Sequence, residues 1–253
     1  MRVLKIQAEG ITTSFRLPHF MHGIQPTFRM PPPATIYGHI CSALGELISP
    51  ESVAFAYRFT SEATFFDLEH TILLTEARGK LKGTSFPQAI SGGLQPFKRE
   101  ILFRPRLTLY LTRPDWLEAF RRPRYAVVLG RSQDLFTYTS VEQIELVQAQ
   151  EAYFEHTLLP RDMVRLLGRG HVELLPRYLD YERKRAPTFS HYLVLEGRAS
   201  SREFWFEEEQ RQQRTGQSSR FWVDPTSPVI AGMHLGLMFH TFGETPYAAF
   251  PLA

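Results

Sequence analysis

The sequence contains little of what would place the protein in an oxidising compartment or a membrane. Its 253 residues include one cysteine, Cys41, which excludes an internal disulfide and any zinc site built from several cysteines. No stretch approaches the roughly 18 to 20 consecutive apolar residues of a membrane-spanning helix, and the N-terminus has no signal-peptide pattern. We therefore expect a cytoplasmic protein with no membrane partner.

The familiar catalytic patterns are missing as well. Nine histidines are present, but they form no HExxH or HD pattern, and the chain has neither a G-x-S-x-G elbow nor a Walker loop. His19 and His22 are three residues apart, and no carboxylate motif accompanies them. The sequence therefore predicts no catalytic residues, no metal site and no cofactor.

Positive charge is concentrated in one segment, although the net charge of the chain is only +3. Residues 78–124 contain eleven basic and three acidic residues, a net charge of +8, which leaves −5 for the rest of the chain. A one-sided charge of this kind attracts polyanions. We therefore expect a nucleic acid to contact this segment.

Three consecutive prolines and a helical pattern fill the stretch from Phe28 to Glu46, FRMPPPATIYGHICSALGE. The prolines hold the chain extended, and the last of them can occupy the first turn of a helix. The apolar residues that follow recur at spacings of three and four, which predicts one buried helix face: Ile36, Ile40, Ala43, Leu44 and Leu47. A stiff helix start with free N–H groups suits a phosphate; a core helix that merely begins with proline is the structural alternative.

A second short motif, Leu129–Leu135 (LGRSQDL), follows a strand predicted over Tyr125–Leu129. A glycine after a strand, here Gly130, permits close approach of another backbone. Arg131 and Ser132 carry groups that bind phosphate and sugar oxygens. In the structural alternative this segment is a turn in which Asp134 pairs with Arg131.

A long stretch without helical or strand period runs from Glu76 to Lys98. Loops of this length inside a compact domain are usually functional or disordered. Its basic residues alternate with Phe86 and Phe97, and cations combined with aromatic rings are what single-stranded nucleic acid binding requires. A solvated surface loop without a ligand is the alternative.

The order of predicted elements indicates an α+β fold. Strands over Val3–Glu9, Ala54–Thr60 and Phe65–Leu74, with the helix after the first, form the opening half of a ferredoxin-like (RRM-type, βαββαβ) unit. The second half comes from further segments: a strand over Ile101–Leu111, a short helix over Pro114–Phe120 and the strand over Tyr125–Leu129. Residues 1–152 are therefore predicted to form this domain, and residues 153–253 a smaller β-rich C-terminal lobe.

The proline-led stretch resembles the signature of the fifth Cas protein family, the RAMP-type subunits of type I CRISPR surveillance complexes (Cascade). That signature reads F-R-x-P-P-P-[AS]-T-x-x-G-x-[IL]-x-x-[AS]-[IL]-G. The LGRSQDL segment is similar to the family's L-G-R-S-x-[DE]-[LC] segment, at the expected distance downstream. The two motifs, their order and the chain length cover essentially the whole family, and subtype I-B is the most similar.

The resemblance implies a non-catalytic RAMP subunit that caps the 5′ handle of a CRISPR RNA (crRNA). It also implies a thumb-like hairpin, inserted at about residues 77–100, that presses on the guide RNA. The implied protein partners are the repeated Cascade backbone subunit and the large PAM-recognising subunit, with target DNA contacted indirectly. The residues expected to contact RNA are Arg29, Thr35, Tyr37, Gly38, His39, Arg78, Lys80, Lys82, Phe86, Phe97, Lys98, Arg99, Arg104, Arg106, Gly130, Arg131 and Ser132.

Two other functions remain open at this stage. The I-C subtype of the resembled family cuts precursor crRNA with a tyrosine, lysine and histidine set that includes adjacent Lys-His after the thumb. This chain has Lys98-Arg99 there, and arginine, being always protonated, cannot act as a base. We therefore expect no nuclease activity, with a metal-independent endoribonuclease as the alternative. A generic assembly protein whose basic surface meets an acidic protein is the third hypothesis.

Overall fold

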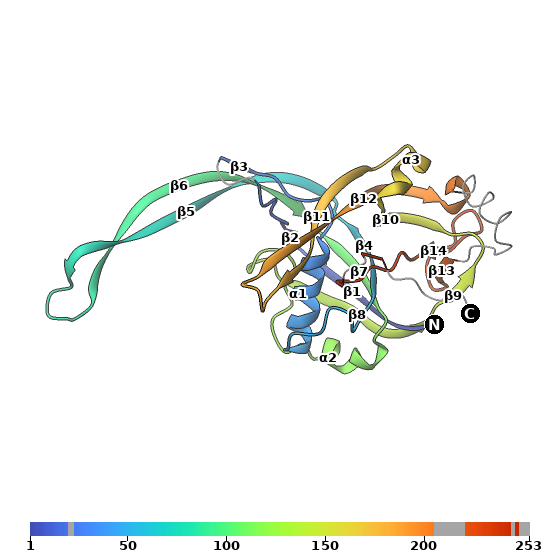
Figure 1. Ribbon diagram of the computed structural model, residues 1–253, viewed down its shortest axis with the longest axis horizontal. Helices are drawn as coiled ribbons and strands as arrows, with labels where there is room; N and C mark the ends of the chain where they lie inside the picture. The colour runs from blue at the N-terminus through green and yellow to red at the C-terminus, as the bar shows by residue number, and fades with distance from the viewer. Residues whose placement is uncertain (20–22, 205–220, 244–245, 248–253) are drawn as a thin grey trace.

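The computed structural model describes residues 1–19, 23–204, 221–243 and 246–247. It contains mixed β-sheets with few helices, so the predicted α+β class is confirmed. Figure 1 shows a body of packed sheets and helices from which one long two-stranded ribbon projects. No helix among the described residues is long and apolar enough to cross a membrane.

The first sheet contains four antiparallel strands in the order β4-β7-β1-β8. These strands are β1 (Arg2–Gly10), β4 (Phe55–Thr60), β7 (Arg106–Leu111) and β8 (Phe136–Glu145). Successive residues of β1 point to opposite faces of the sheet. Leu4 and Ile6 therefore join the buried cluster of helix α1 (Pro33–Leu44), whereas Val3 joins a second cluster on the other face.

The proline-led helix forms as the sequence predicts. Pro33 occupies its first turn, and Gly45 ends it in the left-handed conformation with φ 83°, its N–H donating to Cys41 O at 2.8 Å. The predicted apolar face is buried as far as Ala43, but Leu47 lies beyond the helix end and is 60% exposed. Leu47 was therefore wrongly included in that face, because the helix stops before it.

The ribbon corrects two predictions. The neighbouring β-rich runs over Ala54–Thr60 and Phe65–Leu74 predict a hairpin with each other. Instead, the ribbon consists of β5 (Ala63–Lys80) and β6 (Pro87–Phe103), which pair with each other. Short strands β2 (Thr12–Thr13) and β3 (Ile24–Gln25) add to its base. The stretch predicted as an irregular loop is thus mostly regular ribbon, which shows no period because both of its faces meet solvent.

The predicted strand over Tyr125–Leu129 is wrong. That segment contributes only one bridge, Val128↔Leu135, and Tyr125 is 59% exposed. The chain instead turns and enters β8, which starts at Phe136 and supplies the strand beside β1. The short helix predicted before it is present as η1 (Pro114–Trp116) and α2 (Leu117–Arg121).

A second sheet has the order β11-β12-β10-β14-β13-β9. Its strands are β9 (Val147–Ala149), β10 (Tyr153–Pro160), β11 (His171–Asp180), β12 (Ala186–Ser200), β13 (Phe221–Asp224) and β14 (Leu235–Gly236). Short helical segments lie between them: η2 (Arg161–Met163), α3 (Val164–Leu167) and η3 (Ser201–Phe204). Tyr153 and Leu235 of this sheet share a buried cluster with Val3 of the first, so the two sheets pack directly on each other.

Candidate nucleic-acid interface

A groove of about 500 Å³ runs along the N-terminal half of α1. Thr35, Gly38 and His39 line it from the helix, and Gly130 lines it from the loop before β8. These residues come from both motifs identified in the sequence. The fold therefore brings the two motifs to one surface.

The opposite wall of the groove is formed by the hairpin of β11 and β12, which lies beside α1 (Figure 1). Tyr181 and Phe189 line it with 38% and 37% of their surface exposed. The guanidinium carbon of Arg185 lies 5.5 Å from the centre of the Tyr181 ring. Sequence reasoning assigned no role to this hairpin, although the mixed run of tyrosines and cations over residues 177–185 was a signal.

The groove has a positive electrostatic character. Arg16 and Arg185 line it, and the described lining residues include no aspartate or glutamate. Neither arginine forms an ion pair with any residue that the structure describes. Cations beside exposed aromatic rings, with no competing carboxylate, suit a ligand that carries both a phosphate and a flat ring.

The helix start offers fewer donors than predicted. Pro33 has no N–H, and the N–H groups of Thr35 and Ile36 both donate to Pro32 O, at 2.8 and 3.2 Å. Within the first turn this leaves the Ala34 N–H without an acceptor among the described residues. The prediction of a cluster of free N–H groups is therefore wrong. The prolines that stiffen the turn also remove N–H donors, and the Pro32 carbonyl accepts from two of those that remain.

The two glycines of the motifs have different roles. A Cβ on Gly38 would meet no atom within 4 Å, so the helix surface there is open to a ligand. Gly130 has φ 100°, and a Cβ on it would meet Ser14 O at 2.9 Å and the Thr13 hydroxyl. The close approach predicted at Gly130 is thus made by the protein's own backbone.

Tyr37 is a packing residue. Only 2% of it is exposed, its hydroxyl donates to Ile48 O at 2.5 Å, and its ring packs edge-on against Tyr178 and Phe242 at 5.0 and 5.1 Å. Burial raises the pKa of Tyr37. We therefore exclude Tyr37 from the contact surface, contrary to the expectation from the sequence.

His39 lines the groove but carries no charge. Its Nδ1 lies 2.9 Å from Val128 O and its Nε2 lies 3.0 Å from the Tyr138 hydroxyl. Burial lowers the pKa of His39, so the imidazole is neutral at pH 7. It therefore fixes the segment that leads to Gly130 rather than attracting phosphate.

Arg131 is held in a network of charges at the ribbon base. Its guanidinium bonds both oxygens of Asp134, at 2.7 and 2.9 Å, and also Glu69. Glu69 in turn accepts from Arg99 Nε at 2.6 Å. The hydrogen bonds that Arg131 donates to Asp134 raise the pKa of Arg131 above its ordinary value. The structural alternative for this turn is therefore confirmed, and Arg99 and Arg131 both have carboxylate partners.

Three further cations expected to bind RNA are also paired. Arg104 and Arg106 share Glu62, each at 3.3 Å, and Arg106 also approaches Glu9 at 3.8 Å. Arg29 binds Glu100 at 3.0 Å. Exposed pairs of this kind are worth little in stability, but they reduce the net field toward a polyanion.

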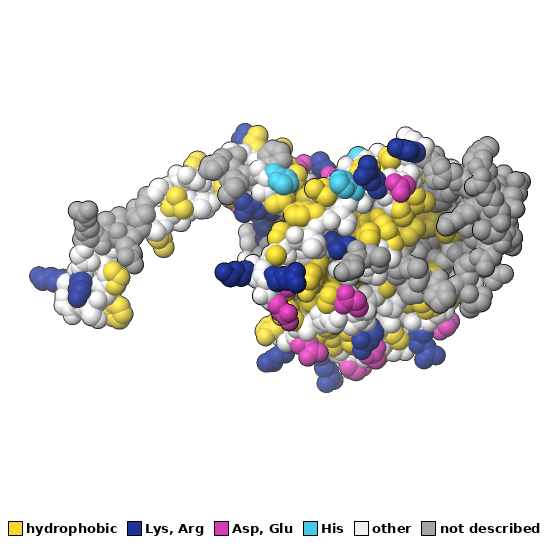
Figure 2. Space-filling view, viewed as in Figure 1, with side chains coloured by type: hydrophobic (Ala, Val, Ile, Leu, Met, Phe, Trp, Pro, Cys, Tyr) yellow, Lys and Arg dark blue, Asp and Glu magenta, His cyan; other side chains and the backbone are white. Residues whose placement is uncertain are grey.

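Unpaired cations lie along the ribbon. Lys80, Lys82 and Lys98 are exposed, and none has an ion-pair partner among the described residues. Figure 2 shows basic side chains at the free end of the ribbon. Since Lys98 lies eleven positions after Pro87, where β6 begins, it is about 35 Å from the tip at 3.3 Å per residue.

The remaining predicted contacts also divide between tip and base. Phe86 is 67% exposed at the tip, whereas Phe97 lies 5.0 Å from the Arg99 guanidinium near the base. Ser132 is exposed beside the groove loop. Arg78 belongs to β5, but its side chain lies outside the described part of the chain. The predicted set thus falls into three places: the groove, the ribbon base and the ribbon tip.

No protein-family profile matches the chain, and no curated protein matches it. Similar folds occur among solved structures of CRISPR proteins. A chain of a CRISPR RNA-guided surveillance complex is 14% identical with TM-score 0.49, covering 76% of this chain and 88% of that one. A CRISPR protein from Archaeoglobus fulgidus is 12% identical (TM-score 0.41; 79% and 91% covered). A chain of the type III-B Cmr-β complex bound to cognate target RNA is 11% identical (TM-score 0.42; 85% and 93% covered).

Proposed function

We propose that this chain is a RAMP-type, non-catalytic subunit of a type I CRISPR surveillance complex that caps the 5′ handle of the crRNA. The observation that carries this proposal is the groove, where both motifs meet Arg16, Arg185 and two half-exposed aromatic rings. Single-stranded RNA is recognised by stacking its splayed bases on aromatic rings while cations hold its phosphates. The groove supplies both kinds of contact.

The strand order supports the RAMP assignment. With α1 after β1 and α2 after β7, the order β4-β7-β1-β8 is that of a ferredoxin-like βαββαβ sheet, with β8 as the last strand. The β5–β6 ribbon is then an insertion between the second and third strands. We assign it as the thumb, which is longer than the segment expected from the sequence.

The proposed RNA contacts differ from those expected at the start. In the groove they are Arg16, Thr35, Gly38, Tyr181, Arg185 and Phe189. Lys98 and the tip residues Lys80, Lys82 and Phe86 contact RNA or neighbouring subunits beyond the groove, because the ribbon carries the tip tens of Å away. The proposed partners remain the repeated backbone subunit, the large PAM-recognising subunit and, indirectly, target DNA, with subtype I-B as the assignment.

The test is binding of a labelled single-stranded RNA with the sequence of a repeat 5′ handle, measured by fluorescence anisotropy. We expect the double variant Arg16→Ala/Arg185→Ala to bind at least tenfold more weakly, with a salt slope reduced by about 1 to 1.5. Arg122→Ala is the control, since Arg122 is an exposed arginine at the end of α2. Equal affinity of the double variant and the control would contradict the groove assignment.

The absence of nuclease activity is part of this proposal. Arg99, at the position where the resembled nucleases have histidine, pairs with Glu69 and cannot take up a proton. Incubation of the chain with repeat RNA in EDTA should leave the RNA intact. Site-specific cleavage would favour the metal-independent endoribonuclease, and a complex that copurifies with other chains but without RNA would favour the assembly protein.

A further inference from the structure

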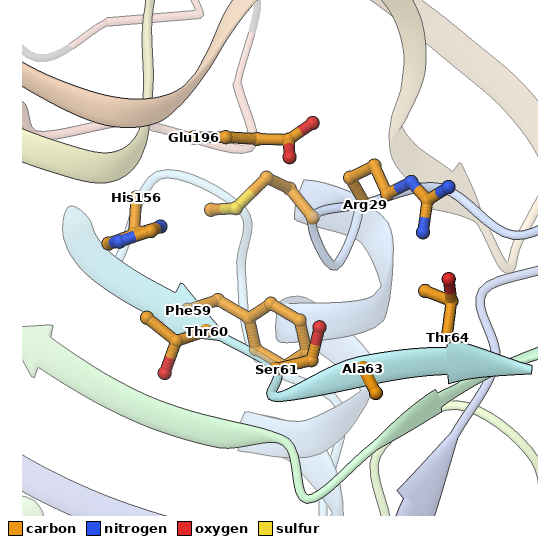
Figure 3. Close-up of a pocket in the computed structure, with 9 residues that line it drawn as sticks. Arg29, Phe59, Thr60, Ser61, Ala63, Thr64, His156 and Glu196 are labelled. Atoms are coloured by element: carbon orange, nitrogen blue, oxygen red, sulfur yellow. The ribbon is translucent and has the colours of Figure 1, made fainter.

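A second cavity, of about 220 Å³, lies between the ribbon base and the second sheet (Figure 3). Arg29 enters it from the segment before α1, His156 from β10 and Glu196 from β12. The end of β4 and the start of β5 add Thr60, Ser61, Ala63 and Thr64. Its described lining residues are all different from those of the groove. It is therefore a separate site.

A β-bulge directs two side chains toward this cavity. Glu155 pairs with Arg198 and Thr157 with Leu195, so His156 stands opposite Glu196 and Gly197 outside the regular ladder. His156 also has φ 50°, a left-handed conformation that costs a non-glycine residue about 1 to 2 kcal/mol. Bulges and strained residues of this kind concentrate at functional sites, where they direct a side chain.

The cavity is rich in hydrogen-bonding groups that are not used within the protein. Glu196 is exposed and forms no ion pair or hydrogen bond with the described residues. The hydroxyls of Thr60, Ser61 and Thr64 likewise make no hydrogen bond to the described part of the chain. Burial, and secondarily Arg58, lower the pKa of His156, so its neutral ring both donates and accepts.

The charge balance of this cavity differs from that of the groove. Arg29, the one lysine or arginine among its described lining residues, is already bonded to Glu100 at 3.0 Å, while the carboxylate of Glu196 is unpaired among the described residues. Such a set attracts phosphate poorly and instead favours a ligand that donates hydrogen bonds from hydroxyl groups. The 2′-hydroxyl of a ribose is such a donor, and it is the group by which proteins distinguish RNA from DNA.

We propose that this cavity binds the sugar of one ribonucleotide, with the Glu196 carboxylate accepting a hydrogen bond from the 2′-hydroxyl. The inference rests on the proposed function and adds to it a means of selecting RNA over DNA. Glu196 and His156 provide the selection, whereas the arginines of the groove hold either kind of backbone.

The test compares the handle RNA with its all-2′-deoxy counterpart of identical sequence, by anisotropy with the full chain. The unaltered chain should bind the RNA about tenfold more tightly, as expected for a hydrogen bond to a charged group. Glu196→Gln should reduce this preference to about twofold without weakening the binding of the deoxy oligonucleotide. Glu142→Gln, which alters an exposed carboxylate on β8, should leave the preference unchanged.

A second variant separates binding from folding. His156→Gly relieves the left-handed strain, so it should keep or raise the melting temperature while lowering the preference for RNA. An unaltered chain with no preference, or a preference that survives Glu196→Gln, overturns the inference while leaving the proposed function intact. Failure of the chain to bind either oligonucleotide overturns both.

Discussion

The body and the ribbon place similar residues in opposite surroundings. In the body, Lys5 is buried against Asp224, and Arg131 in the loop before β8 is paired with Asp134 and Glu69. In the ribbon, Lys80 and Lys82 have no ion-pair partner in the part of the chain that the structure describes, and Leu74 and Phe86 are 72% and 67% exposed. An isolated two-stranded hairpin is marginally stable in water. These charges of the body are therefore satisfied within the protein, whereas the charges and apolar side chains of the ribbon tip are left for other molecules.

The largest expected effect on stability lies in the body, at the buried ion pair between the two sheets. Lys5 Nζ and the Tyr110 hydroxyl both bond Asp224 Oδ2 at 2.8 Å, and Asp224 is fully buried. Asp224→Asn leaves the Lys5 charge buried without its counterion, so the free energy of unfolding should fall by about 3 to 5 kcal/mol. Urea denaturation followed by circular dichroism measures this loss.

The matched control is Asp115→Asn, which breaks an exposed pair with Arg113 at 2.6 Å. Exposed pairs contribute about 0 to 1 kcal/mol, so this variant should unfold almost as the unaltered chain does. A loss below 1 kcal/mol in Asp224→Asn would mean that the two sheets do not depend on this pair.

The next largest expected effect is on the pH dependence of the free energy of unfolding, through His240 in the body. His240 is fully buried among the rings of Phe55, Tyr192 and Tyr247, and this burial lowers its pKa to about 3. Between pH 6.5 and 3 the unfolded chain therefore binds a proton that the folded chain does not. Stability is lost as pH falls through this window, by about 3 kcal/mol at pH 4 from His240 alone.

His240→Phe keeps an aromatic ring and removes the titrating group. Its free energy of unfolding should therefore change less between pH 7 and pH 4 than that of the unaltered chain. The unaltered chain, measured over the same pH range, serves as the control. A pH profile of His240→Phe that superimposes on the control would show that other groups cause the acid loss.

The two motif glycines, Gly130 and Gly38, allow a direct comparison between a contact within the protein and a contact with a ligand. Gly130→Ala forces a side chain into φ 100° and against Ser14 O, so it should destabilise the chain by about 2 kcal/mol or more. Gly38→Ala meets no atom and should stabilise the helix by about 0.5 to 1 kcal/mol. The same Gly38→Ala substitution should weaken handle RNA binding several-fold, because its methyl group enters the groove. Stability changes of opposite sign in the two variants would support these two roles. Equal losses of stability in both variants would contradict them.

The parts of the fold that were predictable from sequence have local signals. Three prolines and a 3.6-residue apolar period define α1, and they predict where it begins; its end at Leu44 was not predicted, because the apolar spacing continues to Leu47 beyond the left-handed Gly45. The apolar and β-rich run over Ala54–Thr60 similarly predicted β4. These signals suffice because each element buries one face against its neighbours, which imposes a period on the sequence.

The parts that were missed depend on contacts between distant residues. The ribbon has no buried face over most of its length, so its strands show no alternation, and nothing local indicates that β5 pairs with β6. The pairing of Arg99 and Arg131 through Glu69 joins three separate segments. In the groove, Thr35 and Gly130 were predicted from motifs, whereas Arg185 reaches it only because β11 and β12 pack beside α1.

The smallest expected effect on stability lies at the ribbon tip, and it gives the sharpest contrast with the body. The triple variant Lys80→Ala/Lys82→Ala/Phe86→Ala changes exposed side chains with no ion-pair partner among the described residues. Its free energy of unfolding should therefore stay within about 0.5 kcal/mol of the unaltered chain. Because the tip projects tens of Å from the groove, a short handle RNA should also bind normally, whereas a longer RNA that extends beyond the groove should bind more weakly.

The matched variant in the body is Lys5→Met, which removes one buried lysine. It should lower the free energy of unfolding without altering how RNA affinity depends on RNA length. A triple variant that unfolds more easily would show that the tip packs on the body.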